Sequence, residues 1–298
     1  MARARIGKLF HLTPLVDSLA DAEFFFDSVF SPLCMMRNYS PHWHRHAAIY
    51  VIAETSIEPM EVLPPPAGKE PTSWFRYTER FGMRVHNLAF YVEGIDDLER
   101  RLVDAGVRTT DAGSGNTLFC HPKDTPGMLE FFPYPHEIWD GLDPRMRPEW
   151  APFRDAFWAT HHPLGLQRMS HITIVVNDLA AAEKFYVELL DATPLPDQPA
   201  TYPDATSRYV VVGEDTVVEL LSPADDDSRP GRDLANVGES VIGASFTVRD
   251  VGKALEHVTR MSAPVATSSD HEIVFDVERT WGCQYRLTDR VLTGDPRV

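Results

Sequence analysis

Two pairs of histidine and glutamate recur at nearly the same separation in this chain. Glu58 follows His11 by 47 positions, and Glu219 follows His171 by 48 positions. Imidazole and carboxylate groups can bind divalent metal ions, and they can also give or take protons during a reaction. A repeated pair of this kind favours a chemical role if the same structural elements carry both copies.

The elements around each pair repeat as well. The alternating residues 10–17 predict a strand, and residues 18–30 predict a helix with a serine cap and apolar residues at helical spacing. Residues 170–178 and 179–190 repeat this strand and helix without a gap. In both places strand-rich sequence follows, and it ends in a short acidic strand that carries the glutamate.

Two further copies of the pattern lie between and after these. The first has a strand at 85–92, a helix at 95–106 that stops at a glycine, and a closing strand at 127–132. The second has the corresponding elements at 242–248, 251–261 and 282–287. The sequence therefore predicts a βαβββ unit four times.

Proline-rich and charged stretches separate the copies, at 64–71, 133–163 and 223–232. The middle stretch is the best interdomain linker. We predict an N-terminal domain at 1–135, a linker at 136–165 and a C-terminal domain at 166–298. A chain of 298 residues is long enough for two such domains.

A histidine in the opening strand and a glutamate in the closing strand of βαβββ units resemble the vicinal oxygen chelate superfamily, which includes glyoxalase I, methylmalonyl-CoA epimerase, extradiol dioxygenases and bleomycin resistance proteins. The segment from Phe119 to Glu130 looks especially like the last hairpin of epimerase and glyoxalase-like members. The resemblance implies an α+β fold in which the four modules pair into two cupped, incomplete mixed-sheet barrels.

The resemblance also implies a metal site in the N-terminal domain. Carried over residue by residue, the ligands are His11, Glu58, His86 and Glu130. Imidazole and oxygen donors suit Zn²⁺, Ni²⁺, Co²⁺, Mn²⁺ or Fe²⁺ and do not choose among them. We therefore expect a divalent metal ion as the cofactor.

Two of these ligands have competitors. By strict spacing Asn87 occupies the slot of His86, and His86 needs a β-bulge or a shifted register to reach the metal. Glu61 competes with Glu58 because Pro59 interrupts the strand. We favour His86 because imidazole is the better ligand, and Glu58 because its spacing matches that of Glu219.

The C-terminal domain departs from the family pattern. His171 and Glu219 are present, but Ile242 or Gly243 occupies the third slot and Tyr285 the fourth. We interpret this half site as structural, or as a wall or dimer surface.

Other side chains are candidates for the substrate cup. His42, His44 and His46 alternate on one side of a predicted strand, and we expect them to line the cup or to titrate at its rim. Six aromatic residues suggest an apolar or aromatic substrate, although aromatics at such spacing are more often core. They are Trp43, Trp74, Phe75, Phe90, Phe131 and Phe132.

The leading hypothesis is a metal-dependent lyase or isomerase that stabilises an enolate, with Glu130 as the base and Glu58 as its counterpart. A first alternative is an Fe²⁺ extradiol dioxygenase with His11, His86 and Glu130 as ligands. A second alternative is a resistance protein that sequesters a small molecule without reaction.

Composition excludes several other classes. A formal charge of −16 argues against a nucleic-acid partner, and no apolar run approaches the length of a membrane span. The basic N-terminal residues lead directly into a predicted strand, so we expect no export, and three scattered cysteines support neither disulfides nor a thiolate zinc site. We expect a soluble, cytoplasmic protein with a small-molecule substrate and a possible homodimeric state.

Overall fold

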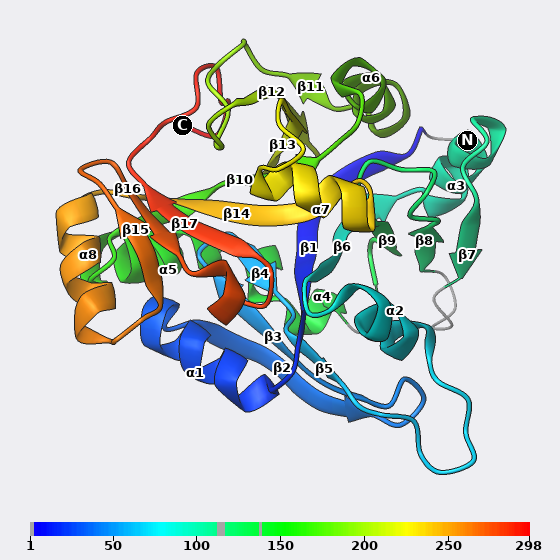
Figure 1. The fold of residues 1–298 in the computed structure, drawn as a ribbon, viewed down its shortest axis with the longest axis horizontal. Coiled ribbons are helices and arrows are strands. Elements are labelled where there is room, and N and C mark those ends of the chain that lie inside the picture. The colour runs from blue at the N-terminus through cyan, green and yellow to red at the C-terminus, as the bar shows by residue number, and fades with distance from the viewer. Residues whose placement is uncertain (1–2, 112–116, 137–138) are drawn as a thin grey trace.

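The protein forms two mixed β-sheets in a computed structural model that describes residues 3–111, 117–136 and 139–298. Within these residues the first sheet has nine strands in the order β2-β3-β4-β1-β6-β9-β8-β7, with β5 pairing β1 and β3. The second sheet has eight strands in the order β11-β12-β13-β10-β14-β17-β16-β15. The two sheets lie against each other, with helices around and between them (Figure 1).

The first sheet combines the first two modules. Its elements are β1 (Arg5–Val16), α1 (Leu19–Phe30), β2 (Leu33–Ser40), β3 (Arg45–Ile52), β4 (Thr55–Ile57), β5 (Met60–Val62), α2 (Ser73–Phe81), β6 (Val85–Glu93), α3 (Ile95–Asp104), β7 (Thr109–Asp111), β8 (Leu118–Cys120) and β9 (Leu129–Pro133). The opening strands β1 and β6 run antiparallel at the centre, and each pairs in parallel with its own closing strand, β4 or β9.

The second sheet repeats this arrangement. Its elements are β10 (Leu166–Val175), α6 (Leu179–Leu190), β11 (Thr193–Pro194), β12 (Ala205–Val212), β13 (Thr216–Pro223), α7 (Arg229–Val237), β14 (Ser240–Val248), α8 (Val251–Arg260), β15 (Val265–Ser268), β16 (Glu272–Phe275) and β17 (Gln284–Thr288). The predicted α+β fold of βαβββ modules, paired into two mixed sheets, is confirmed.

Two helices that the sequence analysis missed precede the second module of each sheet. Thr72, directly after the separator at 64–71, caps α2, and Ser228, within the separator at 223–232, caps α7. Trp74, Tyr77 and Phe81 recur in α2 at helical spacing, so its apolar stripe was readable from the sequence.

The predicted linker is built into the fold. It contains α4 (Trp139–Leu142), the short helix Pro144–Met146, α5 (Trp150–Arg154) and a π-helical segment at Asp155–His161. Trp150 and Trp158 are buried, and the indole of Trp158 donates to the carbonyl of Phe30 at 2.9 Å. The segment thus contributes to the core between the two sheets.

The hydrophobic core continues across both halves. In α1, Phe24 is 70% exposed, whereas Phe25 and Phe26 are buried. The rings of Phe25 and Phe26 pack 5.8 Å from the ring of Tyr285 in the second sheet. Helix α1 also lies beside α8 (Figure 1), where the ring of His257 contacts the carbonyl of Val29 at 3.1 Å.

The turn between β12 and β13 contacts β1 so closely that it requires glycine. Gly213 has φ +64°, and an added Cβ would overlap the backbone oxygen of Gly7. We expect Gly213→Ala to lower the free energy of unfolding by about 2–3 kcal/mol, from backbone strain and the clash together.

Gly68→Ala is the matched control in chemical denaturation. Gly68 also has a positive φ, +76°, but nothing lies within 4 Å of an added Cβ. Strain alone predicts a loss of about 1 kcal/mol there. Equal losses in the two variants would contradict the proposed contact between the halves.

No helix among the described residues has the length and apolar character needed to cross a bilayer.

Candidate functional site

A cavity of about 680 Å³ opens into the first sheet. His11, Glu58 and Glu130 line it. Its other walls are mainly apolar, with six aromatic side chains: Phe10, Trp43, Trp74, Tyr77, Phe119 and Phe132. A concave apolar site with a few converging polar groups is typical of small-molecule binding.

His11 lies between the two glutamates, one beside each ring nitrogen. Its Nδ1 is 2.5 Å from Oε2 of Glu58, and its Nε2 is 3.6 Å from Oε2 of Glu130. All three side chains are buried, with at most 6% of each residue exposed. Neither ring nitrogen makes an aligned hydrogen bond, so the attraction between the three groups is mainly electrostatic.

Local strand geometry explains this convergence. The pairing of β1 with β6 shifts register between Leu9 and His11, which marks a β-bulge directly before the histidine. The closing strands bring in the glutamates: β4 pairs in parallel with β1 just before Glu58, and Glu130 in β9 pairs with Ala89 of β6. Bulges commonly redirect side chains next to functional sites.

The charges within the cluster push its pKa values apart. Burial lowers the pKa of His11, but the charges of Glu58 and Glu130 outweigh burial and raise it to about 9. Burial also raises the pKa of Glu130 above the usual range. For Glu58, His11 and Arg45 outweigh burial and lower the pKa. Glu58 is therefore the firmly ionised carboxylate, and Glu130 is the weaker acid.

Asn87 contacts the cluster, and His86 lies behind it. The amide of Asn87 donates to Oε2 of Glu130 at 2.8 Å, and Nδ1 of His86 lies 2.9 Å from the amide oxygen of Asn87. The bulge that His86 needed does exist, because Asn87 pairs with Thr13 and Val85 with Pro14. His86 lines the cavity, but its ring packs 4.0 Å from that of Trp74.

Glu61 lies away from the cavity. It pairs with Val16 in the β1–β5 ladder, and its Oε2 accepts from the backbone N–H of Leu19 at 3.2 Å. Glu61 thus caps the start of α1, while Glu58 faces His11.

The structure places the three neighbouring histidines differently from the prediction. Pro41–His44 form the turn between β2 and β3. In the described part of the chain, His42, His44 and His46 are not among the residues that line the cavity around His11. The residues between them, Trp43 and Arg45, line it instead. Between the turn and the start of β3, the side chains that reach the cavity are therefore those of Trp43 and Arg45.

Arg45 is the main site residue that the sequence analysis missed. Its Nη1 donates to Oε1 of Glu58 at 3.2 Å, while its Nε is buried without a hydrogen-bond partner. Tyr77 of α2 was also missed. Of the aromatics considered from the sequence, Trp43, Trp74 and Phe132 line the cavity, whereas Phe90 and Phe131 are fully buried in the core.

The side chains as placed do not gather the four predicted ligands around one point, so the four-ligand metal centre stays a prediction. Among the described residues, no three histidine, cysteine, aspartate or glutamate side chains are placed to hold one metal ion. Glu58 and Glu130 approach different ring nitrogens of His11, and one cation can bind only one of these nitrogens. Nε2 of His11 and Glu130 remain as two donors, fewer than the three protein ligands usual in catalytic zinc sites.

The C-terminal half site is filled by the protein itself. Nε2 of His171 lies 2.7 Å from the hydroxyl of Thr201, and Glu219 accepts from the backbone N–H of Thr201 at 2.7 Å. Glu219 also accepts from Thr173 and Tyr209, at 2.7 and 2.8 Å. With these partners the half site has a structural role.

The sequence alignment of the fourth slot was off by one residue. Glu130 pairs with Ala89 in the first sheet, and the corresponding pair in the second sheet is Arg286 with Ser245. Arg286 therefore stands in the place of Glu130, whereas Tyr285 is fully buried in the core. A one-residue shift changes the face of a strand on which a side chain lies.

Glu219→Gln should lower the free energy of unfolding by about 1–3 kcal/mol, because an amide nitrogen cannot accept from the buried donors around it. Chemical denaturation measures this loss. Glu214→Gln is the control, since the Glu214 side chain is 41% exposed in its ion pair with Arg5. A control loss above about 0.5 kcal/mol would argue against this account of Glu219.

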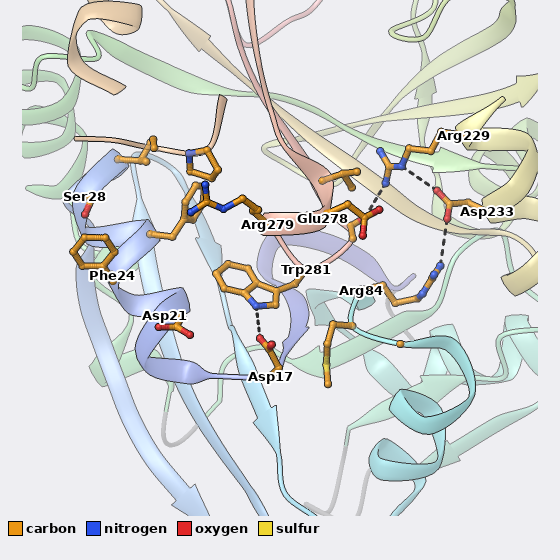
Figure 2. A pocket seen from close by; sticks show the side chains of 18 of the residues that line it. Asp17, Asp21, Phe24, Ser28, Arg84, Arg229, Asp233, Glu278, Arg279 and Trp281 are labelled. Atoms are coloured by element: carbon orange, nitrogen blue, oxygen red, sulfur yellow. Dashed lines mark hydrogen bonds and ion pairs between the residues drawn. The ribbon is translucent and has the colours of Figure 1, made fainter. Parts of the chain in front are cut away.

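A second cavity of about 800 Å³ lies between the two halves. Some of its polar groups join the two halves (Figure 2): the indole of Trp281 donates to Asp17 at 2.8 Å, and Asp233 lies between Arg84 and Arg229. These contacts join the N-terminal half to the 277–282 loop and α7. We therefore interpret this cavity as a feature of the junction between the two halves.

Comparisons with known proteins agree with the fold. Residues 168–276 match the family model described as the Glyoxalase/Bleomycin resistance protein/Dioxygenase superfamily. No curated protein sequence matches the chain.

Solved structures extend the likeness to the whole chain. A triple mutant of 4-hydroxymandelate synthase from Streptomyces coelicolor has a TM-score of 0.69 at 13% identity, covering 96% of this chain and 94% of its own. A xylose isomerase-like TIM barrel/4-hydroxyphenylpyruvate dioxygenase fusion protein has a TM-score of 0.62 at 11% identity, over 99% of this chain and 51% of its own.

At these identities the likeness establishes the fold alone. The family model matches the half of the chain whose site is filled, and the structural match extends the same fold over the half that holds the cavity. Residues 168–276 are therefore a domain of the glyoxalase, bleomycin resistance and dioxygenase superfamily, the vicinal oxygen chelate superfamily, and the whole chain has the paired-module fold of that group.

Proposed function

We propose that the cavity around His11 is the active site of an enzyme that removes a proton from a carbon atom next to a carbonyl group. The reaction class is lyase or isomerase. The substrate is a small apolar or aromatic molecule with two neighbouring oxygen atoms. One observation carries the proposal: a buried histidine lies between two buried glutamates in the wall of an aromatic-lined cavity.

The different environments of the two glutamates suggest their roles. Glu130, whose pKa is raised, takes the proton from the substrate carbon, because a group that ionises closer to neutral pH exchanges protons more readily. Glu58 stays ionised and holds His11 in its protonated form. Asn87 orients the Glu130 carboxylate by donating to it.

Two cations then stabilise the charge that forms. When the C–H bond next to a substrate carbonyl breaks, its electron pair forms a C=C bond and the carbonyl π pair moves onto the oxygen, while protonated His11 and Arg45 face that charge from the cavity wall. Return of the proton to the carbon skeleton completes an isomerisation. Loss of a leaving group from the adjacent carbon completes an elimination.

A divalent metal ion stays a prediction, and no step above depends on it. The dioxygenase alternative required His11, His86 and Glu130 as a ligand set, and the bond of His86 to Asn87 gives no support for that set. The aromatic lining favours simple sequestration of an apolar molecule as the second candidate function.

Deuterium exchange separates these functions. Protein prepared without a histidine tag is incubated in D₂O with aromatic 2-hydroxy ketones and 2-oxo acids, and proton NMR follows the signal at the carbon next to oxygen. The proposed enzyme accelerates loss of that signal. Binding without exchange supports sequestration, and oxygen uptake with catechols after iron loading supports the dioxygenase.

The same samples test the metal. Elemental analysis of the purified protein, together with the exchange assay in the presence of a chelator, shows whether a divalent ion is bound and needed. Exchange that persists in metal-free protein supports a site in which Glu130 acts as the base without a metal ion. Exchange that is lost on chelation and restored by one of the five predicted metals would support the metal-dependent form.

A further inference from the structure

The same three-residue segment, Asp-Pro-Arg, follows each of the two sheets. Asp143-Pro144-Arg145 follows the first sheet, and Asp295-Pro296-Arg297 follows the second. Arg145 and Asp143 are almost fully buried, with side-chain exposures of 1% and 0%. A buried arginine needs a partner for each of its five N–H groups, so its contacts show what it holds in place.

Arg145 uses all five donors. Its Nε and one Nη2 donor bind Asp143, at 2.9 and 2.6 Å. The other donors reach backbone carbonyls, those of Leu9 at 2.8 Å, Phe10 at 3.1 Å and Glu54 at 3.3 Å. Leu9 and Phe10 come directly before His11, and Glu54 lies in the turn that leads to Glu58.

Arg297 makes the same contacts in the second half. It binds Asp295 through Nε and Nη2, at 2.9 and 2.8 Å. It donates to the carbonyls of Met169, Ser170 and Asp215, at 3.2, 2.6 and 2.6 Å. Met169 and Ser170 come directly before His171, as Leu9 and Phe10 come before His11. Asp215 comes four residues before Glu219, as Glu54 comes four residues before Glu58.

The bulge in β1 explains why an arginine is needed there. The register shift between Leu9 and His11 interrupts the regular ladder, and buried carbonyls outside a ladder need other donors. Arg145 supplies them, and the hydroxyl of Ser56 also donates to Phe10. The bulge in turn determines the side of the strand from which the His11 ring projects.

From these contacts we infer that Arg145 is a positioning residue for the candidate active site. It fixes the bulge before His11 and the turn before Glu58, so that the His11 ring stays between Glu58 and Glu130. The inference rests on the proposed function in treating this cluster as the reacting site. Arg297 has the same role for a half site that Thr201 fills.

The two arginines provide a matched experiment. Arg145→Lys and Arg297→Lys each keep the charge and lose the forked donors. Both are expected to lower the midpoint of thermal unfolding by a similar amount. Histidine-ring ¹H–¹⁵N spectra, with the His11 signals assigned by His11→Gln, show what happens to the site.

Arg145→Lys should shift or broaden the His11 signals and slow deuterium exchange on an accepted substrate by roughly 10- to 100-fold, the scale expected for a misplaced reacting group. Arg297→Lys should leave both unchanged. Unmoved His11 signals in Arg145→Lys, or equal changes in the two variants, would overturn the inference.

Ser56→Ala covers the case in which Arg145→Lys does not fold. It removes the hydroxyl donor to Phe10 and leaves both arginine–aspartate pairs intact. A smaller shift of the same His11 signals supports the inference, and an unchanged His11 spectrum contradicts it. The His11 signals can be measured without any reaction. If the unaltered protein shows no deuterium exchange, the proposed function fails, and the spectra still test whether Arg145 positions His11.

Discussion

Glu130→Gln slows deuterium exchange at the substrate carbon by roughly 100- to 10,000-fold, the usual contribution of a positioned general base. The amide cannot accept the proton, whereas its oxygen can still accept from Asn87. The packing of the site therefore changes little. Exchange rates from proton NMR, measured at saturating substrate, report the effect on the chemical step.

Glu219→Gln is the matched control for this variant. Glu219 is equally buried and lies beside the repeated histidine, but Thr201 fills its surroundings. It should lose stability and keep the exchange rate. The assignment of Glu130 as the base fails if Glu130→Gln exchanges at the original rate, or if both variants slow exchange to the same extent.

Phe26→Ala is expected to lower the free energy of unfolding by about 3–5 kcal/mol. The Phe26 ring is fully buried between Tyr50 of the first sheet and Tyr285 of the second, with ring centroids 6.0 and 5.8 Å away. Truncation leaves a cavity where the two halves meet. Urea denaturation, followed by far-ultraviolet circular dichroism and tryptophan fluorescence, measures the loss.

Phe24→Ala is the control, because Phe24 belongs to the same helix and is 70% exposed. Its effect should stay within about 0.5 kcal/mol. The shared core also predicts that both probes report a single transition in each protein. Two separated transitions, with only one of them moved by Phe26→Ala, would mean that the halves unfold independently.

The repeats made the fold readable from the sequence. The strand and helix at 10–30 and at 170–190 align without a gap, and apolar periodicity fixes both element types locally. The helices α2 and α7 were missed because prolines and charges nearby outweighed their short apolar stripes. The predicted domain limits at 135 and 166 stay a prediction, although Arg145 and Trp158 bind the intervening segment to the core.

The candidate site was only partly readable. Spacing brought out His11 and Glu58, because the repeat placed them on an opening and a closing strand, and the family resemblance added Glu130. It did not bring out Arg45, which neighbours three more conspicuous histidines in Pro41–His46. Strict spacing gave the third slot to Asn87, whereas we favoured His86 as the better ligand; which of the two faces the cluster depends on a bulge that has no local sequence signature.

The sequence by itself determined the repeated βαβββ pattern and the three side chains that converge in the first half, because hydrophobic periodicity and internal repetition act over short distances along the chain. The tertiary structure decided which ring nitrogen of His11 each glutamate approaches, and that Thr201 fills the equivalent site in the second half. It also brought the arginine of each Asp-Pro-Arg segment onto the strand residues before the histidine of its own half. These outcomes depend on bulges, strand register and contacts between distant segments, where a shift of one residue moves a side chain to the opposite face.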